Sequence, residues 1–264
     1  MPTYPAIIDL RDARAYAHSR PAGAVRLSRQ DVRERAYLLP PRHRRVVLVG
    51  GSVTDAKPVL AALRLAGRNV EHLPHETWRD AMREESGTPT RTRLWEPATV
   101  VERATQYLEA RPVRTALDLA CGSGRNAVYL AEHGFDVTAI DRDSEALARA
   151  RDLAARHGVT LHTQPRDLER PGALEGLRAD LVVVVRFLDR SLFSALPSVL
   201  APGGLLAYET FTVDQAARGH PRQARFLLQA QELRGAFPGL QCLEYEEDAF
   251  DEAHLARLIA RRPV

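Results

Sequence analysis

The sequence predicts an α/β fold, in which a doubly wound, mostly parallel sheet of seven strands follows a smaller α/β unit. The first reason is that short apolar runs alternate with segments of helical periodicity through most of the chain after residue 98. The second is a sharp glycine turn, Gly122-Ser123-Gly124, that joins an apolar run to a helix. The third is a separate strand–turn–helix–strand pattern before residue 85, which indicates a βαβ unit of its own.

The elements of the first unit, residues 1–85, follow from its apolar runs and its glycines. Strands are expected at residues 6–10, 45–49 and 69–73, with a helical turn at residues 12–18 and a helix that ends at residue 66. The middle strand is apolar without alternation, which is typical of a buried parallel strand. Gly50 and Gly51 turn the chain after it, and Thr54 or Asp55 is expected to cap the helix.

A polar segment with glycine and prolines, residues 86–98, is expected to link the two units. Pro97 suits the start of a helix over residues 98–109, because the first helical turn leaves its N–H groups unpaired and proline has none to lose. The apolar residues of this helix fall on one face, which predicts that it packs against a sheet.

The second unit, residues 99–264, alternates strands and helices. Its strands are expected at residues 115–119, 136–140, 160–164, 180–185, 205–209, 240–246 and 254–261, and its helices at residues 125–133, 145–157, 192–200 and 229–237. The first two helices end at Gly134 and Gly158, and Ser144 is expected to cap the second one. The last two strands follow each other without a helix between them, which predicts an antiparallel pair at the edge of the sheet.

The composition argues against several other classes of protein. The 264 residues include 37 Lys+Arg and 34 Asp+Glu, and a net charge of +3 gives little indication of a nucleic-acid surface. Two cysteines cannot build a disulfide framework, and no group of Cys and His has metal-ligand spacing, so no metal is expected. No apolar run is long enough to span a membrane, and we expect a cytoplasmic protein with no membrane partner.

Two acidic residues flank the glycine turn. Asp118 lies four residues before Gly122, and Asp141 follows the next expected strand, 19 residues beyond that glycine. The glycine spacing also fits a dinucleotide site, but a carboxylate at position 118 would repel a pyrophosphate. A ligand with an ammonium group and a sulfonium centre would gain from Asp118, and Asp141 can accept hydrogen bonds from both ribose hydroxyls. These residues therefore favour S-adenosylmethionine over NAD as the cofactor.

The chain from residue 93 onward resembles a class I S-adenosylmethionine-dependent methyltransferase, which has a Rossmann-like fold. The resemblance implies that Asp118 holds the methionine amino group, that the glycine turn lines the cofactor and that Asp141 binds the ribose. It also implies that Asp167 lies at the adenine amino group, with Leu168 beside it. The complete expected cofactor set is Asp118, Ala120, Gly122, Gly124, Asn126, Asp141, Arg142, Asp167, Leu168 and Arg186.

The first unit resembles a rhodanese-like sulfurtransferase domain in residues 8–11, in residues 18–24 and in the strand, loop and helix that follow Arg45. An active sulfurtransferase has a cysteine directly after the central strand, where this chain has Gly50 or Gly51. Without a thiol there is no persulfide carrier, so the resemblance implies a catalytically inactive domain that acts as a docking module, a lid or a dimer surface. Anion binding by the backbone N–H groups of the glycine loop is the alternative.

The acceptor is expected where the parallel strands end, as in other open α/β sheets. Arg186 and Phe187 follow the fourth strand of the second unit, and Glu209 ends the fifth. Arg186 favours an anionic or soft acceptor and is a catalytic candidate together with Glu209, which is a base, an ammonium ligand or a structural acid. Arg222 and Arg225 lie in a segment expected to cover the substrate and to bind it. The alternative is that they are solvated or form ion pairs with the glutamates Glu232, Glu246 and Glu247.

Three short segments, residues 208–211, 225–228 and 232–233, resemble small methyltransferases of the tellurite-resistance and thiol-methylating kind. The resemblance implies an enzyme that transfers a methyl group to a small anionic or soft acceptor containing sulfur, selenium or tellurium. Two alternatives stay open: an RNA or protein methyltransferase that docks through the first unit, and a non-catalytic sensor of S-adenosylmethionine. Whether the chain acts as a monomer or as a homodimer is also open.

Overall fold

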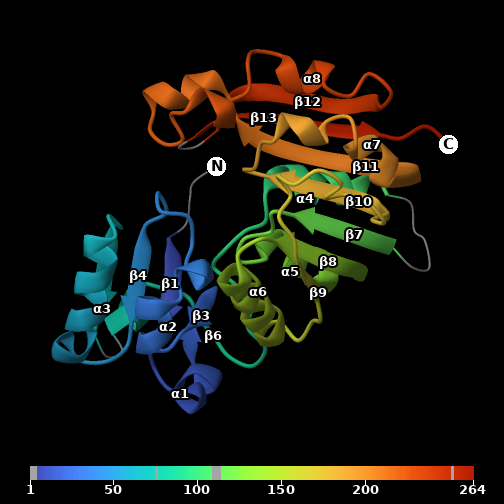
Figure 1. The fold of residues 1–264 in the computed structure, drawn as a ribbon. Helices are drawn as coiled ribbons and strands as arrows, with labels where there is room; N and C mark the ends of the chain where they lie inside the picture. Colours follow the sequence, from blue (N-terminus) through green and yellow to red (C-terminus); the bar gives the residue numbers. More distant parts are fainter. Residues whose placement is uncertain (1–4, 75–76, 109–113, 251–252) are drawn as a thin grey trace. The chain divides into compact units, whose positions relative to one another are not determined.

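The computed structural model describes residues 5–74, 77–108, 114–250 and 253–264, and the chain forms two compact units, Met1–Glu96 and Pro97–Val264 (Figure 1). The boundary between the units therefore falls inside the segment expected to be a linker, residues 86–98. Two residues of this segment, Leu94 and Trp95, are each 1% exposed. The fully buried Arg20 also reaches this segment, since its guanidinium donates to the carbonyl of Gly87 at 2.8 Å.

The first unit contains a four-stranded parallel sheet in the order β3-β1-β4-β5. Its strands are β1 (Ala6–Asp9), β3 (Ala24–Arg26), β4 (Val46–Val49) and β5 (Val70–Leu73), and a separate antiparallel pair is formed by β2 (Arg20–Pro21) and β6 (Glu84–Glu85). Its α-helices are α1 (Ala13–His18), α2 (Arg29–Glu34) and α3 (Val53–Leu65). The three strands expected from the sequence are present.

The predicted N-cap of α3 is wrong. Ser52 caps the helix, because its side chain accepts a hydrogen bond from the Asp55 N–H at 3.1 Å. The Asp55 carboxylate in turn accepts from the Ser52 N–H, so Asp55 is the third residue of a capping box and not the cap itself. Thr54 lies inside the first turn.

The second unit contains a seven-stranded sheet in the order β12-β13-β11-β10-β7-β8-β9, which Figure 1 shows from top to bottom. Its strands are β7 (Arg114–Leu119), β8 (Phe135–Asp141), β9 (His162–Pro165), β10 (Ala179–Val185), β11 (Leu200–Phe211), β12 (Gln241–Phe250) and β13 (Ala253–Arg261). The first five pair in parallel, and β13 runs antiparallel to both β11 and β12. The expected mixed sheet and its antiparallel edge pair are confirmed.

The helices of the second unit are α4 (Thr99–Gln106), α5 (Arg125–Glu132), α6 (Ser144–Arg156), α7 (Leu196–Val199) and α8 (Glu232–Gly235). Two predicted helices are much shorter than expected. Helix α7 begins only at Leu196, after a separate turn at Arg190–Leu192, and α8 begins only at Glu232. Asp143, not Ser144, caps α6. The predicted end of the first helix at residue 109 lies outside the described residues.

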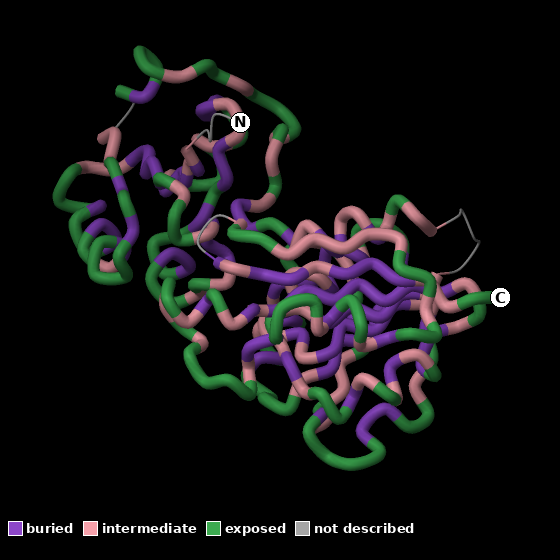
Figure 2. Tube along the Cα trace, turned by 90° about the horizontal axis from the view of Figure 1, so that it is seen from above, coloured by how far each residue is buried: buried purple, intermediate pink, exposed green. Residues whose placement is uncertain are grey.

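The core of the second unit lies on both faces of its sheet, and the buried strands run through the middle of this unit in Figure 2. Helices α4, α5 and α6 contact the strands directly. An apolar cluster includes Val182, Val184 and Tyr208 from the strands and Leu196, Leu233 and Phe237 from the region of α7 and α8. Helices thus flank a sheet whose parallel strands all end at one edge, where the expected site lies. Among the described residues, no helix has the length and apolar character to cross a membrane.

Candidate functional site

The glycine turn lies between the carboxyl ends of β7 and β8. The Cys121 N–H donates to the carbonyl of Ile140 at 2.9 Å, and the Gly122 N–H donates to Oδ2 of Asp141 at 2.8 Å. Asp141 is the last residue of β8, and its Oδ1 accepts from the Asp143 N–H at 2.9 Å. The structure therefore brings the turn and Asp141 together, as expected. Each carboxylate oxygen of Asp141 keeps a lone pair for a further donor.

Asp118 lies below the turn and is 1% exposed. Its Oδ2 accepts a hydrogen bond from the Ala127 N–H, near the start of α5, at 3.0 Å. Burial raises the pKa of the Asp118 carboxyl to about 7, and the charge of nearby Asp141 acts in the same direction, while the hydrogen bond from Ala127 opposes both. Burial also raises the pKa of the Cys121 thiol, and the two aspartates add to this effect. Both shifts favour the uncharged forms of these groups as long as no cation lies beside them.

A cationic ligand fits these residues. Within the described parts of the chain, no ion pair of Asp118 or Asp141 is observed. Gly122 has φ +54°, and a Cβ atom built on it would meet nothing within 4 Å, so the turn has an open side. An ammonium and a sulfonium group next to the two carboxylates would supply the missing positive charge. The two carboxylates and the open glycine turn thus suit S-adenosylmethionine.

Gly124 has a packing role that the sequence does not reveal. A Cβ atom on it would lie 2.6 Å from Cβ of Ala150 on α6, and its φ is +76°. Glycine at this position lets α5 begin close to α6. Ala120, by contrast, adopts φ +56° although it is not a glycine.

Two other members of the expected cofactor set have protein partners. The Asn126 side chain accepts a hydrogen bond from the Ala98 N–H at 2.9 Å, which joins the start of α5 to the start of α4. Arg142 is exposed and pairs with Glu169 at 3.2 Å. Asn126 follows the glycine turn and Arg142 follows Asp141 in the sequence. Their observed contacts are with the protein and do not indicate a ligand contact.

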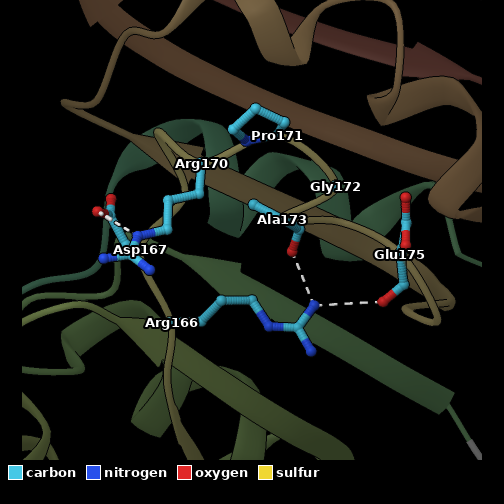
Figure 3. A pocket seen from close by; sticks show the side chains of 7 residues that line it. All are labelled: Arg166, Asp167, Arg170, Pro171, Gly172, Ala173 and Glu175. Carbon is cyan, nitrogen blue, oxygen red and sulfur yellow. Dashed lines mark hydrogen bonds and ion pairs between the residues drawn. The ribbon is translucent and has the colours of Figure 1, made fainter.

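An open cavity of about 500 Å³ lies over the segment that follows β9 (Figure 3). It is lined by Arg166, Asp167, Arg170, Pro171, Gly172, Ala173 and Glu175. The Asp167 side chain is 34% exposed, whereas Leu168 is 3% exposed and packs in the core cluster. The Arg166 N–H donates to the carbonyl of Asp141 at 3.0 Å. This segment therefore begins beside Asp141, the residue expected to bind the ribose.

Arg186 directly follows β10 and has an unusual backbone conformation. Its φ is +55°, and its N–H donates to the carbonyl of Glu209 at 2.7 Å. The exposed guanidinium lies 5.5 Å from the centroid of the Phe211 ring, and no carboxylate partner of it is observed among the described residues. Phe187 packs partly against the core, and its carbonyl accepts from the Tyr208 hydroxyl at 3.1 Å. Arg186 thus stays available at the edge where the strands end.

Glu209 is buried and paired. Its Oε2 lies 2.7 Å from Nε of Arg257, the residue opposite it on β13, and the Glu209 side chain is 4% exposed. Of the three roles left open for Glu209, this geometry favours the structural acid. Sequence reasoning missed Arg257. A basic residue inside the apolar run Leu255–Ala260 was the available indication, because such a residue needs a buried partner.

Arg222 and Arg225 are exposed on the segment between β11 and α8. The Arg225 guanidinium lies 4.4 Å from the Phe226 ring centroid. Their predicted ion pairs are not observed, because the three glutamates bond to other residues: Glu232 to Arg190, Glu246 to Arg103 and Arg257, and Glu247 to Gln231 and Tyr245. No contact in the described parts of the chain joins either arginine to Arg186.

A family model matches part of the second unit. Residues 116–204 match the model of a family described as a methyltransferase domain. The chain is 30% identical over 102 residues to ubiquinone biosynthesis O-methyltransferase of Cronobacter sakazakii, a match of 37% of this chain and 42% of that protein. It is 30% identical over 145 residues to hemagglutinin 1 of Eikenella corrodens, a match of 52% of this chain and 46% of that protein. The chain thus spans less than half of the length of these relatives.

Solved structures show the same fold. TehB from Haemophilus influenzae gives a TM-score of 0.51 at 24% identity, over 62% of this chain and 61% of that one. The PH0226 protein from Pyrococcus horikoshii gives a TM-score of 0.51 at 16% identity, over 62% of this chain and 88% of that one. Together with the family match and the geometry of the glycine turn, these likenesses lead to one conclusion: the second unit is a class I S-adenosylmethionine-dependent methyltransferase domain.

Proposed function

We propose that the chain transfers a methyl group from S-adenosylmethionine to a small acceptor that is anionic or soft, with sulfur, selenium or tellurium as the reacting atom. The observation that carries the methyl-transfer part is the pair Asp118 and Asp141 around an open glycine turn, without an observed cationic partner in the described residues. The acceptor class rests on Arg186 and on the sequence resemblance to small thiol- and tellurite-methylating enzymes.

The cofactor, when bound, supplies an electrophilic methyl group. Asp118 would accept hydrogen bonds from the ammonium group of the methionine part. Asp141 would accept hydrogen bonds from the ribose hydroxyls and keep its hydrogen bond from the Gly122 N–H. Asp167 accepts from the adenine amino group. Because these contacts fix three parts of one ligand, they fix the direction of its methyl group, and orientation is the main requirement of a methyl transfer.

Arg186 binds the acceptor in this proposal. Its guanidinium is exposed at the end of β10 and lies over Phe211, which supports it from one side. The left-handed backbone at this non-glycine residue is the kind of strain that is found at functional sites. Since Arg257 pairs with Glu209, no free general base is observed at this point among the residues that the structure describes, and an acceptor that is already anionic needs none.

The first unit is proposed to be a rhodanese-like domain without sulfurtransferase activity. A Cβ atom on Gly50 would lie 2.4 Å from Cγ of Arg11, and the Arg11 guanidinium is held by the buried Asp9 at 2.6 Å. A nucleophilic side chain at position 50 would therefore collide with Arg11. We propose that this unit docks a partner or a second copy of the chain, and that the whole protein is cytoplasmic.

A second candidate function is methylation of a macromolecule. The exposed Arg218, Arg222 and Arg225 on one segment without an observed carboxylate partner among the described residues favour it. Relatives of the chain also include ribosomal RNA small subunit methyltransferase B of Thermus thermophilus, which is 44% identical over 68 residues. Steep weakening of acceptor binding by salt would support this candidate, whereas a small acceptor with one charge predicts a shallow dependence.

The experiment is a screen of the labelled methyl donor against small thiols, sulfide, selenite and tellurite, with calorimetry of cofactor binding. We expect Arg186→Ala to lower kcat/KM for the accepted compound at least tenfold and to change the cofactor Kd less than threefold, since the lost ion contact belongs to the acceptor. Arg234→Ala, at an exposed arginine of α8 outside the expected site, serves as the control. An equal loss in turnover and cofactor affinity for Arg186→Ala would show that the role given to Arg186 is wrong.

A further inference from the structure

The segment between β9 and β10, residues 166–178, carries the expected adenine contact without a regular helix or strand. Its backbone is held by local turn bonds, such as the Ala173 N–H to the carbonyl of Arg170 at 3.1 Å and the Glu175 N–H to that of Gly172 at 2.9 Å. Bonds across three residues define single turns but do not hold the two ends of a long segment together. A separate contact must do so.

Arg166 makes that contact. Its backbone N–H ties the start of the segment to the end of β8, through the carbonyl of Asp141. Its guanidinium crosses to the far side, where Nη1 donates to the carbonyl of Ala173 at 2.7 Å and to that of Glu175 at 3.3 Å (Figure 3). Hydrogen bonds from a charged donor are about twice as strong as those between neutral groups, so Arg166 closes the segment firmly.

Asp167 is placed between two fixed residues. Arg166 precedes it, and Leu168, which follows, is 3% exposed in the core cluster. The Asp167 carboxylate lines the cavity, and its Oδ1 accepts from the Glu169 N–H at 3.1 Å. With both neighbours held, the backbone of Asp167 has little freedom to turn the carboxylate away from the cavity.

We propose that Arg166 is a positioning residue that closes this segment and so holds Asp167 toward the adenine amino group. This inference rests on the proposed function, because it takes Asp167 as the adenine contact. Arg170 lines the same cavity and offers a matched comparison. Its side chain is 82% exposed and meets Asp167 only at 3.6 Å, so it closes nothing and is expected to contribute little.

The test is calorimetric titration of the full chain with S-adenosylhomocysteine and with its inosine counterpart, in which a carbonyl replaces the adenine amino group. The unchanged protein is expected to prefer the adenosine ligand about tenfold or more, since the carbonyl would face the Asp167 carboxylate. Arg166→Ala is expected to reduce this preference to about threefold or less, and Arg170→Ala to keep it. A purely structural loss would weaken both ligands by one factor and leave their ratio unchanged.

Arg166→Lys covers the case in which Arg166→Ala does not fold, because lysine keeps the charge and the stem but cannot bridge two carbonyls in the same way. It is expected to show an intermediate preference. Arg166 variants with the preference of the unchanged protein would overturn the positioning role alone. An unchanged protein that binds both ligands equally would overturn the adenine contact of Asp167 and the role of Arg166 with it. If the unchanged protein binds neither ligand, the proposed function itself fails.

Discussion

Replacing Asp118 by Asn separates the stability of the free protein from its affinity for the cofactor. Asparagine has the same shape and still accepts the hydrogen bond from Ala127, but it removes a charge that is 1% exposed. The folded carboxyl has a pKa of about 7, against 3.8 for an exposed aspartate. Since one pKa unit corresponds to about 1.4 kcal/mol, ionised Asp118 destabilises the free protein by up to about 4 kcal/mol above pH 7.

The sign of the pH effect follows from proton binding. Between about pH 4 and about pH 7 the folded state keeps a proton on Asp118 that the unfolded state has lost, so stability falls as the pH rises through this window. We therefore expect Asp118→Asn to unfold at higher urea concentration than the unchanged protein at pH 8, and the difference to shrink toward pH 4. Cofactor affinity at pH 8 is expected to fall although stability rises. The loss of one charged hydrogen bond should raise the Kd about 10- to 100-fold.

The assays are urea unfolding at pH 4.5, 6 and 8 without ligand and calorimetry with S-adenosylmethionine at pH 8. Asp248→Asn, at an exposed aspartate of β12, is the control and is expected to change neither quantity. The reasoning is refuted if Asp118→Asn follows the unchanged protein in stability at every pH and binds the cofactor equally well. Loss of affinity without any gain in stability would refute only the statement that the buried charge is uncompensated.

Three further predictions concern stability and are measured by urea unfolding. Gly124→Ala is expected to destabilise the second unit by about 2–4 kcal/mol, because its Cβ meets Ala150 and its backbone is left-handed; unchanged stability would contradict the packing role. Arg257→Met leaves the buried Glu209 unpaired and is expected to cost about 3 kcal/mol or more, and adding Glu209→Leu should recover most of it. Ser52→Ala removes the cap of α3 and should destabilise the first unit by about 1 kcal/mol, whereas Thr54→Ala should change little.

The sheet of the second unit was predictable because its information is local. The central strands β7, β10 and β11 contain short apolar runs, and the glycines after the early helices mark where the chain turns. The short α7 and α8 were not predictable in this way, since their apolar residues fit a longer helix as well as they fit a turn packed on the core. The boundary between the two units falls inside the segment expected to be a linker, but the polar composition of that segment does not reveal that Leu94 is 1% exposed.

The same distinction between local sequence patterns and tertiary contacts applies to the residues of the site. The placement of Asp118, Asp141 and Gly122 was predictable because a strand–turn–helix pattern fixes their positions by sequence distance alone, and their role toward the cofactor stays a prediction. The partner of Glu209 was not, because Arg257 is 48 residues away and meets it only through the pairing of β11 with β13. Arg166 was missed because it donates to backbone carbonyls. Every residue has such a carbonyl, so no residue type in the sequence indicates the contact.

The contrast between Glu209 and Asp118 is the strongest reason to expect a cationic ligand. Both acids are buried in one sheet, at 3% and 1% exposure. Glu209 has Arg257 beside it, which is how a protein normally keeps a buried charge. Asp118 has one backbone N–H and a second carboxylate nearby, and burial raises its pKa instead. Among the residues that the structure describes, an arginine pairs with Glu209 and none lies within hydrogen-bond reach of Asp118. The charge of Asp118 is then left to a ligand, and a sulfonium nucleoside with an ammonium group provides that balance.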